Sequence, residues 1–250
     1  MKLALLSDIH ANIQAFEACL AHARERGAQQ FALLGDLVGY GADPVAVVER
    51  AQALAAQGAF LIKGNHDEMA VRPPAVVQTV GDSTAAWTHA QLSAEQRSFL
   101  DQLPLTLQLQ SMLLLHASAD GPALWRYVDD ERAASASMDA ASAMPEVRYV
   151  FGGHVHQQTL FHRGAGTSLM KFIPTAGVVL PLPRHRHWLA TVGSVGQPRD
   201  RNPQAMYALF DTEKLQFTFH RVAYDHHAAA VAIRQAALPA QFADRLELGR

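Results

Sequence analysis

Residues 2–10 have the sequence KLALLSDIH, in which a short apolar run ends at a serine and an aspartate. An apolar run of this length closed by polar residues is typical of a buried β-strand. Similar runs recur at residues 31–34 and 60–63, and apolar residues at helical spacing lie between the runs. This order of strand, helix, strand, helix and strand predicts right-handed crossovers and a mostly parallel sheet.

Residues that start and stop helices lie between these strands at the expected places. Asn12 precedes the first helical segment as a candidate N-cap, and Gly27 follows it as a candidate stop. The second segment begins at Asp43 and Pro44, a candidate N-cap followed by proline at the first helical position, and it runs to Gly58. Both segments are predicted to connect neighbouring parallel strands.

The rest of the chain predicts further strands and a helical tail. Ser93 begins a capping box, and the Ala/Ser-rich residues 133–143 predict another helix. Strands are predicted at residues 112–115, 149–151, 159–162, 188–192, 205–210 and 215–222. A last helix begins at Asp225 and is interrupted or ended by Pro239. We predict one α/β domain over residues 1–250, with two packed mixed β-sheets flanked by helices and a C-terminal helical tail.

Composition narrows the class of protein. Hydrophobic residues make up 49% and charged residues 18% of the 250 residues, which fits a globular protein and argues against disorder. A net charge of −2 without a Lys/Arg-rich run gives no sign of nucleic-acid polymer binding. The single cysteine, Cys19, excludes an internal disulfide and fits a reducing compartment. Asp8 interrupts the N-terminal apolar run too early for a signal peptide or membrane span, so we expect a cytoplasmic protein with no membrane partner.

Potential metal ligands gather where the predicted strands end. In an open α/β sheet, sites form outside the carboxyl ends of the strands, so these loops can converge. The residues are Asp8 and His10, Asp36, Asn65 with His66 and Asp67, His116, and His154 with His156. Taken singly, these residues have ordinary alternatives: a turn or capping aspartate for Asp8 or Asp36, a packed core histidine for His116, and a structural residue for His66.

The type and number of these residues indicate two metal ions. Asp8 and His10 are two positions apart, so they point the same way on an extended segment, as do His154 and His156. Carboxylate and imidazole ligands suit Mn, Fe, Zn or Ni. Without His66 and Asp67, seven candidate ligands remain, which exceed the four of an ordinary zinc site, and Asp36 is our candidate for a bridging carboxylate. Two divalent ions, two aspartates and a hydroxide would leave a charge of about +1, which attracts a phosphate anion.

The series Asp-x-His, Gly-Asp, Gly-Asn-His-Asp, a lone strand-end His and Gly-His-x-His resembles the calcineurin-like metallophosphoesterase superfamily. The chain is most similar to its small prokaryotic branch, through residues 35–41 (GDLVGYG) and 193–200 (GSVGQPRD). The resemblance implies an αββα sandwich and two divalent metal ions as cofactors. It implies one ion held by Asp8, His10, Asp36 and His156, and another held by Asp36, Asn65, His116 and His154.

The same resemblance assigns catalytic roles. His66 is expected beside the leaving-group oxygen as a general acid or a cationic stabiliser, with Asp67 orienting it. Arg199 is a candidate contact for substrate phosphate, with a salt bridge to Asp200 as the alternative. Tyr40 either stacks on a substrate base or packs within the protein. Two departures from the family pattern occur, at Ala117 in place of glycine and at residues 191–192 (TV) in place of Asn-Pro, and neither removes a ligand.

The expected function is hydrolysis of a phosphoester by attack of a metal-bridging hydroxide. A small phosphorylated substrate, either a phosphodiester or a nucleotide-like molecule, is favoured over a phosphoprotein. The reason is that no long insertion suggests a surface on which a protein could dock. The alternatives are a phosphomonoesterase, a protein phosphatase, or a metal-binding scaffold without catalysis. Manganese is among the expected metals.

Overall fold

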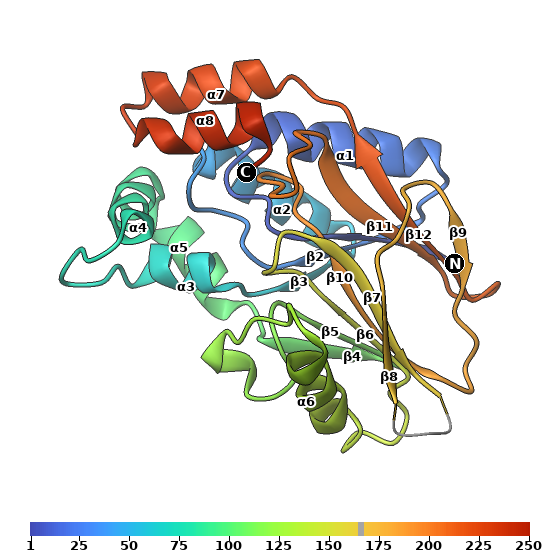
Figure 1. Cartoon of the computed structure of the whole chain (residues 1–250). Coiled ribbons are helices and arrows are strands. Elements are labelled where there is room, and N and C mark those ends of the chain that lie inside the picture. Colours follow the sequence, from blue (N-terminus) through green and yellow to red (C-terminus); the bar gives the residue numbers. More distant parts are fainter. Residues whose placement is uncertain (165–167) are drawn as a thin grey trace.

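Strand β1 (Lys2–Leu6) lies in the middle of one of two packed sheets in the computed structural model, which describes residues 1–164 and 168–250 (Figure 1). The order of this sheet is β3 (Phe60–Ile62), β2 (Gln30–Leu34), β1, β11 (Ala205–Asp211), β12 (Gln216–Val222) and β9 (Val179–Pro181). Strands β1, β2 and β3 are parallel to one another, whereas β11 is antiparallel to β1. The predicted parallel start is confirmed, and the complete sheet is mixed.

The second sheet is also mixed. Its order is β4 (Thr106–Leu109), β5 (Met112–Leu115), β6 (Tyr149–Gly152), β10 (His187–Val192), β7 (Gln158–Arg163) and β8 (Leu169–Phe172). Strands β5, β6 and β10 are parallel to one another. Strand β4 pairs antiparallel with β5, β7 pairs antiparallel with β10, and β8 pairs antiparallel with β7. The edge strands β8 and β9 are absent from the sequence prediction, because their side chains are largely exposed and carry no burial signal.

The alternation of side chains along β1 explains why the sheets and helices form layers. Leu3 and Leu5 face the second sheet, where they join a cluster with Phe151. Ala4 and Leu6 point to the opposite face and pack in a different cluster that contains Phe16 of α1 (Ile13–Glu25). Successive residues of a strand face opposite sides, so a continuous apolar run serves both layers. The two-sheet α/β sandwich predicted from the sequence is confirmed.

Helices cover both outer faces. Helix α2 (Pro44–Ala56) shares the cluster of α1 on the first sheet, and α6 (Glu131–Ala141) packs on the second. The Asn12 side chain accepts from the Ala15 N–H, which confirms the predicted N-cap. Asp43 occupies the N-cap position of α2, as predicted, but its side chain makes no capping hydrogen bond.

A group of short helices lies beside the sheet ends in Figure 1, namely α3 (Asn65–Val71), α4 (Val80–Gln91) and α5 (Ala94–Gln102). The capping box at Ser93 is confirmed for α5. The tail forms α7 (His226–Gln235), capped by Asp225 as predicted, and a separate helix α8 (Ala240–Leu248) that follows Pro239. The predicted last helix is thus interrupted, and its first part ends before Pro239 is reached. Within the described residues, no helix combines the length and apolarity needed to cross a membrane.

Candidate metal centre

The loops after five strands bring the candidate ligands together through an unusual backbone conformation. Five of the seven candidates have positive φ angles: Asp8 (53°), His10 (50°), Asp36 (53°), His154 (66°) and His156 (60°). A left-handed conformation costs a non-glycine residue roughly 1–2 kcal/mol and clusters at functional sites. Backbone hydrogen bonds between the first two loops hold it in place, because the N–H groups of Asp8 and His10 donate to the carbonyls of Gly35 and Asp36, each at 3.0 Å.

Two glycines allow these loops to approach one another. A Cβ atom on Gly153 would collide with Ser7 and with the Asp8 carboxylate, and one on Gly64 would collide with Asp36. Both positions therefore place backbone directly against a candidate ligand. Glycine is therefore required at both positions by the close packing of the loops.

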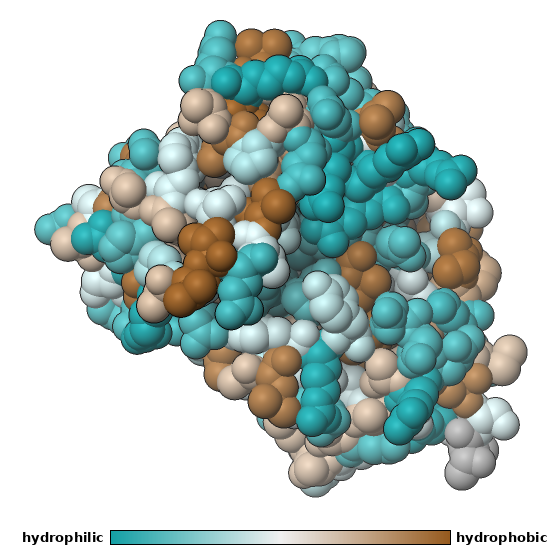
Figure 2. All heavy atoms as spheres, turned by 60° about the vertical axis from the view of Figure 1, so that its left-hand side comes forward, coloured by the Kyte–Doolittle hydropathy of each residue, from teal (hydrophilic) through white to brown (hydrophobic). Residues whose placement is uncertain are grey.

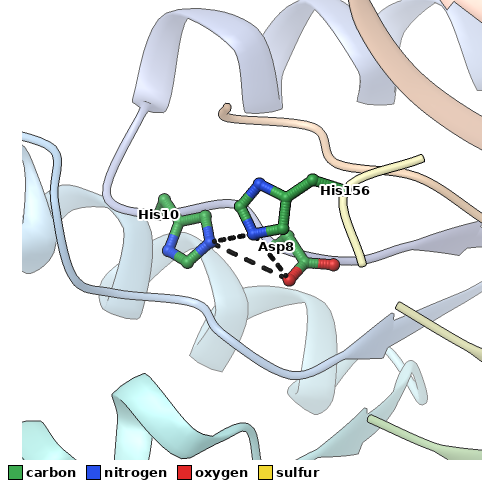
Figure 3. Close-up of side chains that lie close together, drawn as sticks. All are labelled: Asp8, His10 and His156. Atoms are coloured by element: carbon green, nitrogen blue, oxygen red, sulfur yellow. Dashed lines mark hydrogen bonds and ion pairs between the residues drawn. The ribbon is translucent and has the colours of Figure 1, made fainter. Parts of the chain in front are cut away.

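The first cluster consists of Asp8, His10 and His156, all buried (Figure 3). The Nε2 atoms of His10 and His156 are 3.0 Å apart. The Asp8 Oδ1 atom lies 3.3 Å from Nε2 of His156 and 3.8 Å from Nε2 of His10. In Figure 3 the two rings and the carboxylate point to a common centre.

The second cluster consists of Asp36, His116 and His154. The Nε2 atom of His116 lies 3.3 Å from Oδ2 of Asp36 and 3.2 Å from Nδ1 of His154. The Asn65 side-chain oxygen lies 3.1 Å from the same nitrogen. Oδ2 of Asp36 is also 3.9 Å from Nε2 of His10, so this one oxygen lies between the two clusters.

Backbone carbonyls fix the tautomer of each histidine. Nδ1 of His10, His116 and His156 donates to the carbonyls of Val38, Leu34 and Gln197, at 3.3, 2.8 and 2.6 Å. His154 uses Nε2 in the same way, at 2.9 Å from the Trp125 carbonyl. A carbonyl only accepts, so the opposite ring nitrogen of a neutral imidazole presents a lone pair. Lone pairs and carboxylate oxygens thus converge at about 3 Å spacing, an arrangement that fits divalent cations held by oriented histidines.

Electrostatics inside the clusters favour a positive charge. Burial lowers the pKa of the His116 ring, but the Asp36 carboxylate outweighs it and raises that pKa to about 9. Burial and the neighbouring His116 lower the pKa of His154 to about 4. Burial would raise the pKa of Asp36, yet His116 and His66 hold it well below its usual range. A proton and a metal ion compete for the same nitrogen of His116, and Asp36 attracts either one.

His66 and Asp67 have different surroundings. His66 joins His10 and Asp36 in a third group of close side chains, and its backbone N–H donates to Oδ1 of Asp36 at 2.8 Å. The Asp67 carboxylate accepts the N–H groups of Leu37 (2.8 Å), Val38 (3.2 Å) and Gly64 (2.9 Å). Every hydrogen bond of the Asp67 side chain that the structure describes goes to backbone, and none goes to the His66 ring. Asp67 therefore ties two ligand loops together instead of orienting His66 directly.

Arg199 and Tyr40 lie next to the clusters. The Arg199 guanidinium donates to Oε1 of Gln197 at 2.8 Å and lies 5.9 Å from the centre of the Tyr40 ring. The alternative salt bridge between Arg199 and Asp200 is wrong, because Asp200 pairs with Arg221. Tyr40 is packed, with ring centres 4.3 Å from His66, 4.7 Å from His10 and 4.8 Å from Phe242 of the tail.

Sequence reasoning missed the turn at residues 121–127. Trp125 has a φ of 50°, and its carbonyl accepts the hydrogen bond from Nε2 of His154. Tyr127 stacks on the His154 ring with centres 4.0 Å apart and planes at 23°. Residues 121–127 read GPALWRY, and this pair of aromatic residues after a Gly-Pro turn was the available signal.

Comparison with known proteins agrees with this geometry. The model of the calcineurin-like phosphoesterase superfamily domain matches residues 1–215. The chain belongs to the calcineurin-like phosphoesterase superfamily. A crystal structure of a metallophosphoesterase from Sphaerobacter thermophilus superposes with a TM-score of 0.86 at 30% identity, covering 100% of this chain and 99% of that one.

Two further relatives span the whole length of this calcineurin-like chain. The uncharacterized protein MJ0912 of Methanocaldococcus jannaschii is 29% identical over 262 residues, which cover 99% of this chain and 98% of the relative. The hypothetical protein PH1004 from Pyrococcus horikoshii has the same fold, with a TM-score of 0.76 at 21% identity, covering 100% of this chain and 98% of that one. The similarity to both therefore includes the C-terminal tail.

Proposed function

We propose that this calcineurin-like chain is a binuclear metal-dependent hydrolase of small phosphoesters, with phosphodiesters preferred. The observation that carries the proposal is that one oxygen, Oδ2 of Asp36, lies near His10 of the first cluster and His116 of the second. Family membership supports the general reaction class. A cytoplasmic location, in keeping with the single buried Cys19, is part of the same proposal.

The ligand sets follow the two clusters. Asp8, His10, Asp36 and His156 would hold one ion, and Asp36, Asn65, His116 and His154 would hold the other. Two ions so placed supply Lewis acidity and a nucleophile derived from water at neutral pH. Mn, Fe, Zn and Ni all fit nitrogen and oxygen ligands of this kind.

The protein itself contributes orientation and proton transfer. The carbonyls of Val38, Leu34, Trp125 and Gln197 fix the ligand histidines, so little reorganisation is needed when substrate binds. His66 lies beside His10 of the first cluster and Asp36 of the second. In this proposal the protonated His66 ring gives its proton to the leaving-group oxygen or stabilises that oxygen as a cation. In this proposal Arg199, held by Gln197 above Tyr40, contacts a non-bridging phosphate oxygen.

A metal-supplemented substrate screen tests the proposal. The chelated protein would be reloaded with Mn, Fe(II), Zn or Ni and assayed with bis(p-nitrophenyl) phosphate, p-nitrophenyl phosphate and a phosphotyrosine peptide. We expect the diester to be hydrolysed best. Preference for the monoester or the peptide would favour the phosphomonoesterase or protein phosphatase alternative. Metal binding without hydrolysis of any substrate would favour the scaffold alternative.

A further inference from the structure

An open pocket of about 480 Å³ borders the second cluster on the side of α3. Figure 2 turns this side of the molecule forward and shows a recess near the middle of the face. Asn65 and His154 line the pocket, and both contact His116 in the second cluster. A ligand in the pocket would therefore touch the candidate metal centre. The other lining residues are Glu68, Met69, Arg72, Trp125 and Tyr127.

Tyr127 offers an aromatic face at this pocket. Its side chain is 53% exposed although it is large and apolar in most of its area. One face of the ring is stacked on His154, at a centre-to-centre distance of 4.0 Å, which fixes the ring orientation. An oriented and exposed aromatic ring beside a reactive centre is suited to stacking against a planar ligand group.

Trp125, which lines the same pocket, is held by two hydrogen bonds. Its indole N–H donates to Oε2 of Glu68 at 3.0 Å, and its carbonyl accepts from His154. The polar atoms of Trp125 are thus engaged within the protein, and its ring contributes apolar surface to the pocket. Helix α3, which carries Glu68, is linked in this way to the aromatic turn.

The charges at the pocket argue against a second phosphate as its occupant. Of the lining residues that the structure describes, Arg72 is the only cation, and it pairs with Asp101 at 2.8 Å. Glu68 adds a negative charge that is engaged with Trp125. An uncharged planar group matches this lining better than an anion does, because an anion would face Glu68 without a free cation.

We propose that the pocket is a specificity subsite for an uncharged aromatic ester group of a phosphodiester, with Tyr127 as its specificity-determining residue. This inference rests on the proposed phosphodiesterase function. The phosphate would lie at the metal centre while the aromatic group, an aryl ring or a nucleobase, stacks on Tyr127. Stacking of a base on an aromatic side chain is worth roughly a 5- to 150-fold gain in affinity.

Three diesters with the same leaving group test the subsite: methyl, phenyl and thymidine 5′-esters of p-nitrophenyl phosphate. With the Mn-loaded protein we expect kcat/KM to be roughly 10-fold or more higher for an aromatic ester than for the methyl ester. Tyr127→Ala should collapse this ratio, and Tyr127→Phe should restore it. Leu124→Ala is the control, since Leu124 is 60% exposed on the same turn and does not line the pocket.

The outcomes separate the subsite from the reaction. Preference for both aromatic esters supports a general aryl subsite, and preference for thymidine alone supports a nucleobase subsite. Equal kcat/KM for all three esters, or a ratio unchanged in Tyr127→Ala, overturns the inference while the proposed function stands. If no ester is hydrolysed with any metal, the proposed function fails. Calorimetry then still tests the subsite, because thymidine 5′-monophosphate should bind more tightly than inorganic phosphate only when Tyr127 is present.

Discussion

His66 is the residue for which structure and chemistry most clearly separate catalysis from metal binding. Its ring lies against His10 and Tyr40, but it is in neither of the two ligand sets. His66→Ala should therefore retain both metal ions and lower kcat by roughly 10²–10⁴-fold, the usual contribution of a general acid. Metal content by elemental analysis and kcat with bis(p-nitrophenyl) phosphate measure the two effects.

The control for this substitution is His185→Ala, because His185 is exposed and is not one of the candidate ligands. It should change neither metal content nor kcat. Equal losses in the two variants, or metal-free His66→Ala protein, would show that the role given to His66 is mistaken.

Asp36 is predicted to be a ligand that both metal ions share. Its Oδ2 faces His10 of the first cluster and His116 of the second, so Asp36→Asn should lower bound metal from two ions to one or none per chain. Asp139→Asn, at an exposed ion pair with Arg163, should keep two ions. Anomalous scattering from metal-loaded crystals measures this directly. A full complement of two ions in Asp36→Asn would contradict the bridging role.

At the scale of single residues, the aspartates and histidines of the site could be predicted from the sequence, whereas its aromatic residues could not. Asp8, Asp36 and His116 were predictable because a polar residue ends each apolar strand, and the structure brings these residues together. Trp125 and Tyr127 escaped prediction, since a lone aromatic in a turn packs in the core more often than it lines a site. Their positions depend on a left-handed turn that apolar periodicity does not encode.

Among the elements, the tail has a role beyond packing on α1. Phe242 of α8 lies against Tyr40, and Tyr40 lies against His66. Phe242→Ala should leave metal content unchanged, lower kcat by roughly 10-fold through a misplaced His66, and cost about 3–5 kcal/mol in stability. The kcat value, metal content and melting temperature of this variant provide the readouts.

The matched control lies on the same helix. Leu248→Ala removes a side chain that is 52% exposed, and it should leave kcat and melting temperature near those of the natural protein. Phe242→Leu keeps most of the volume and should recover most of the stability. Loss of bound metal in Phe242→Ala would mean that the tail supports the ligand loops instead of His66.

Some helices and strands can be predicted from local sequence signals alone, and others cannot. Long apolar runs and capped helices such as α1 and α5 were predicted within a few residues. The exposed edge strand β8 and the short helix α3 were not, because β8 buries little surface and α3 is only 7 residues long. Strand β8 forms by pairing with β7, and the start of α3 is held by the Asp67 carboxylate, which accepts from the Gly64 N–H. Neither interaction leaves an apolar pattern in the sequence.

For the molecule as a whole, part of the layered fold was predictable, because the successive apolar runs of β1, β2 and β3 form neighbouring strands. The pairing of β1 with β11, which joins the start of the chain to residues 205–211, has no signature in either strand. This pairing and the loop at residues 193–197 bring the C-terminal third onto the ligand loops. The Gln197 carbonyl that orients His156 is one consequence.

The charge balance of the metal centre makes stability depend on pH and metal together. In the chelated protein Asp36 raises the pKa of His116 from 6.5 to about 9, so this pair stabilises the fold fully below pH 6.5 and ceases to do so as pH rises through 9. Burial lowers the pKa of His10 and His154, so both are neutral above pH 7 and do not change in this window. Burial and Asp36 raise the pKa of Asp67 to about 7, and its contribution has been lost before pH 8.

Between pH 8 and 9 the melting temperature of the chelated protein should therefore fall by several degrees more than that of the Mn-loaded protein. Metal binding requires the neutral ring of His116, so it strengthens over the same range and the gap between the two forms widens. Calorimetric melting of both forms at matched ionic strength measures the gap. His116→Gln should flatten it, because the glutamine side chain cannot take up the proton. A gap that narrows with rising pH would place the titrating charge elsewhere than on the pair of His116 and Asp36.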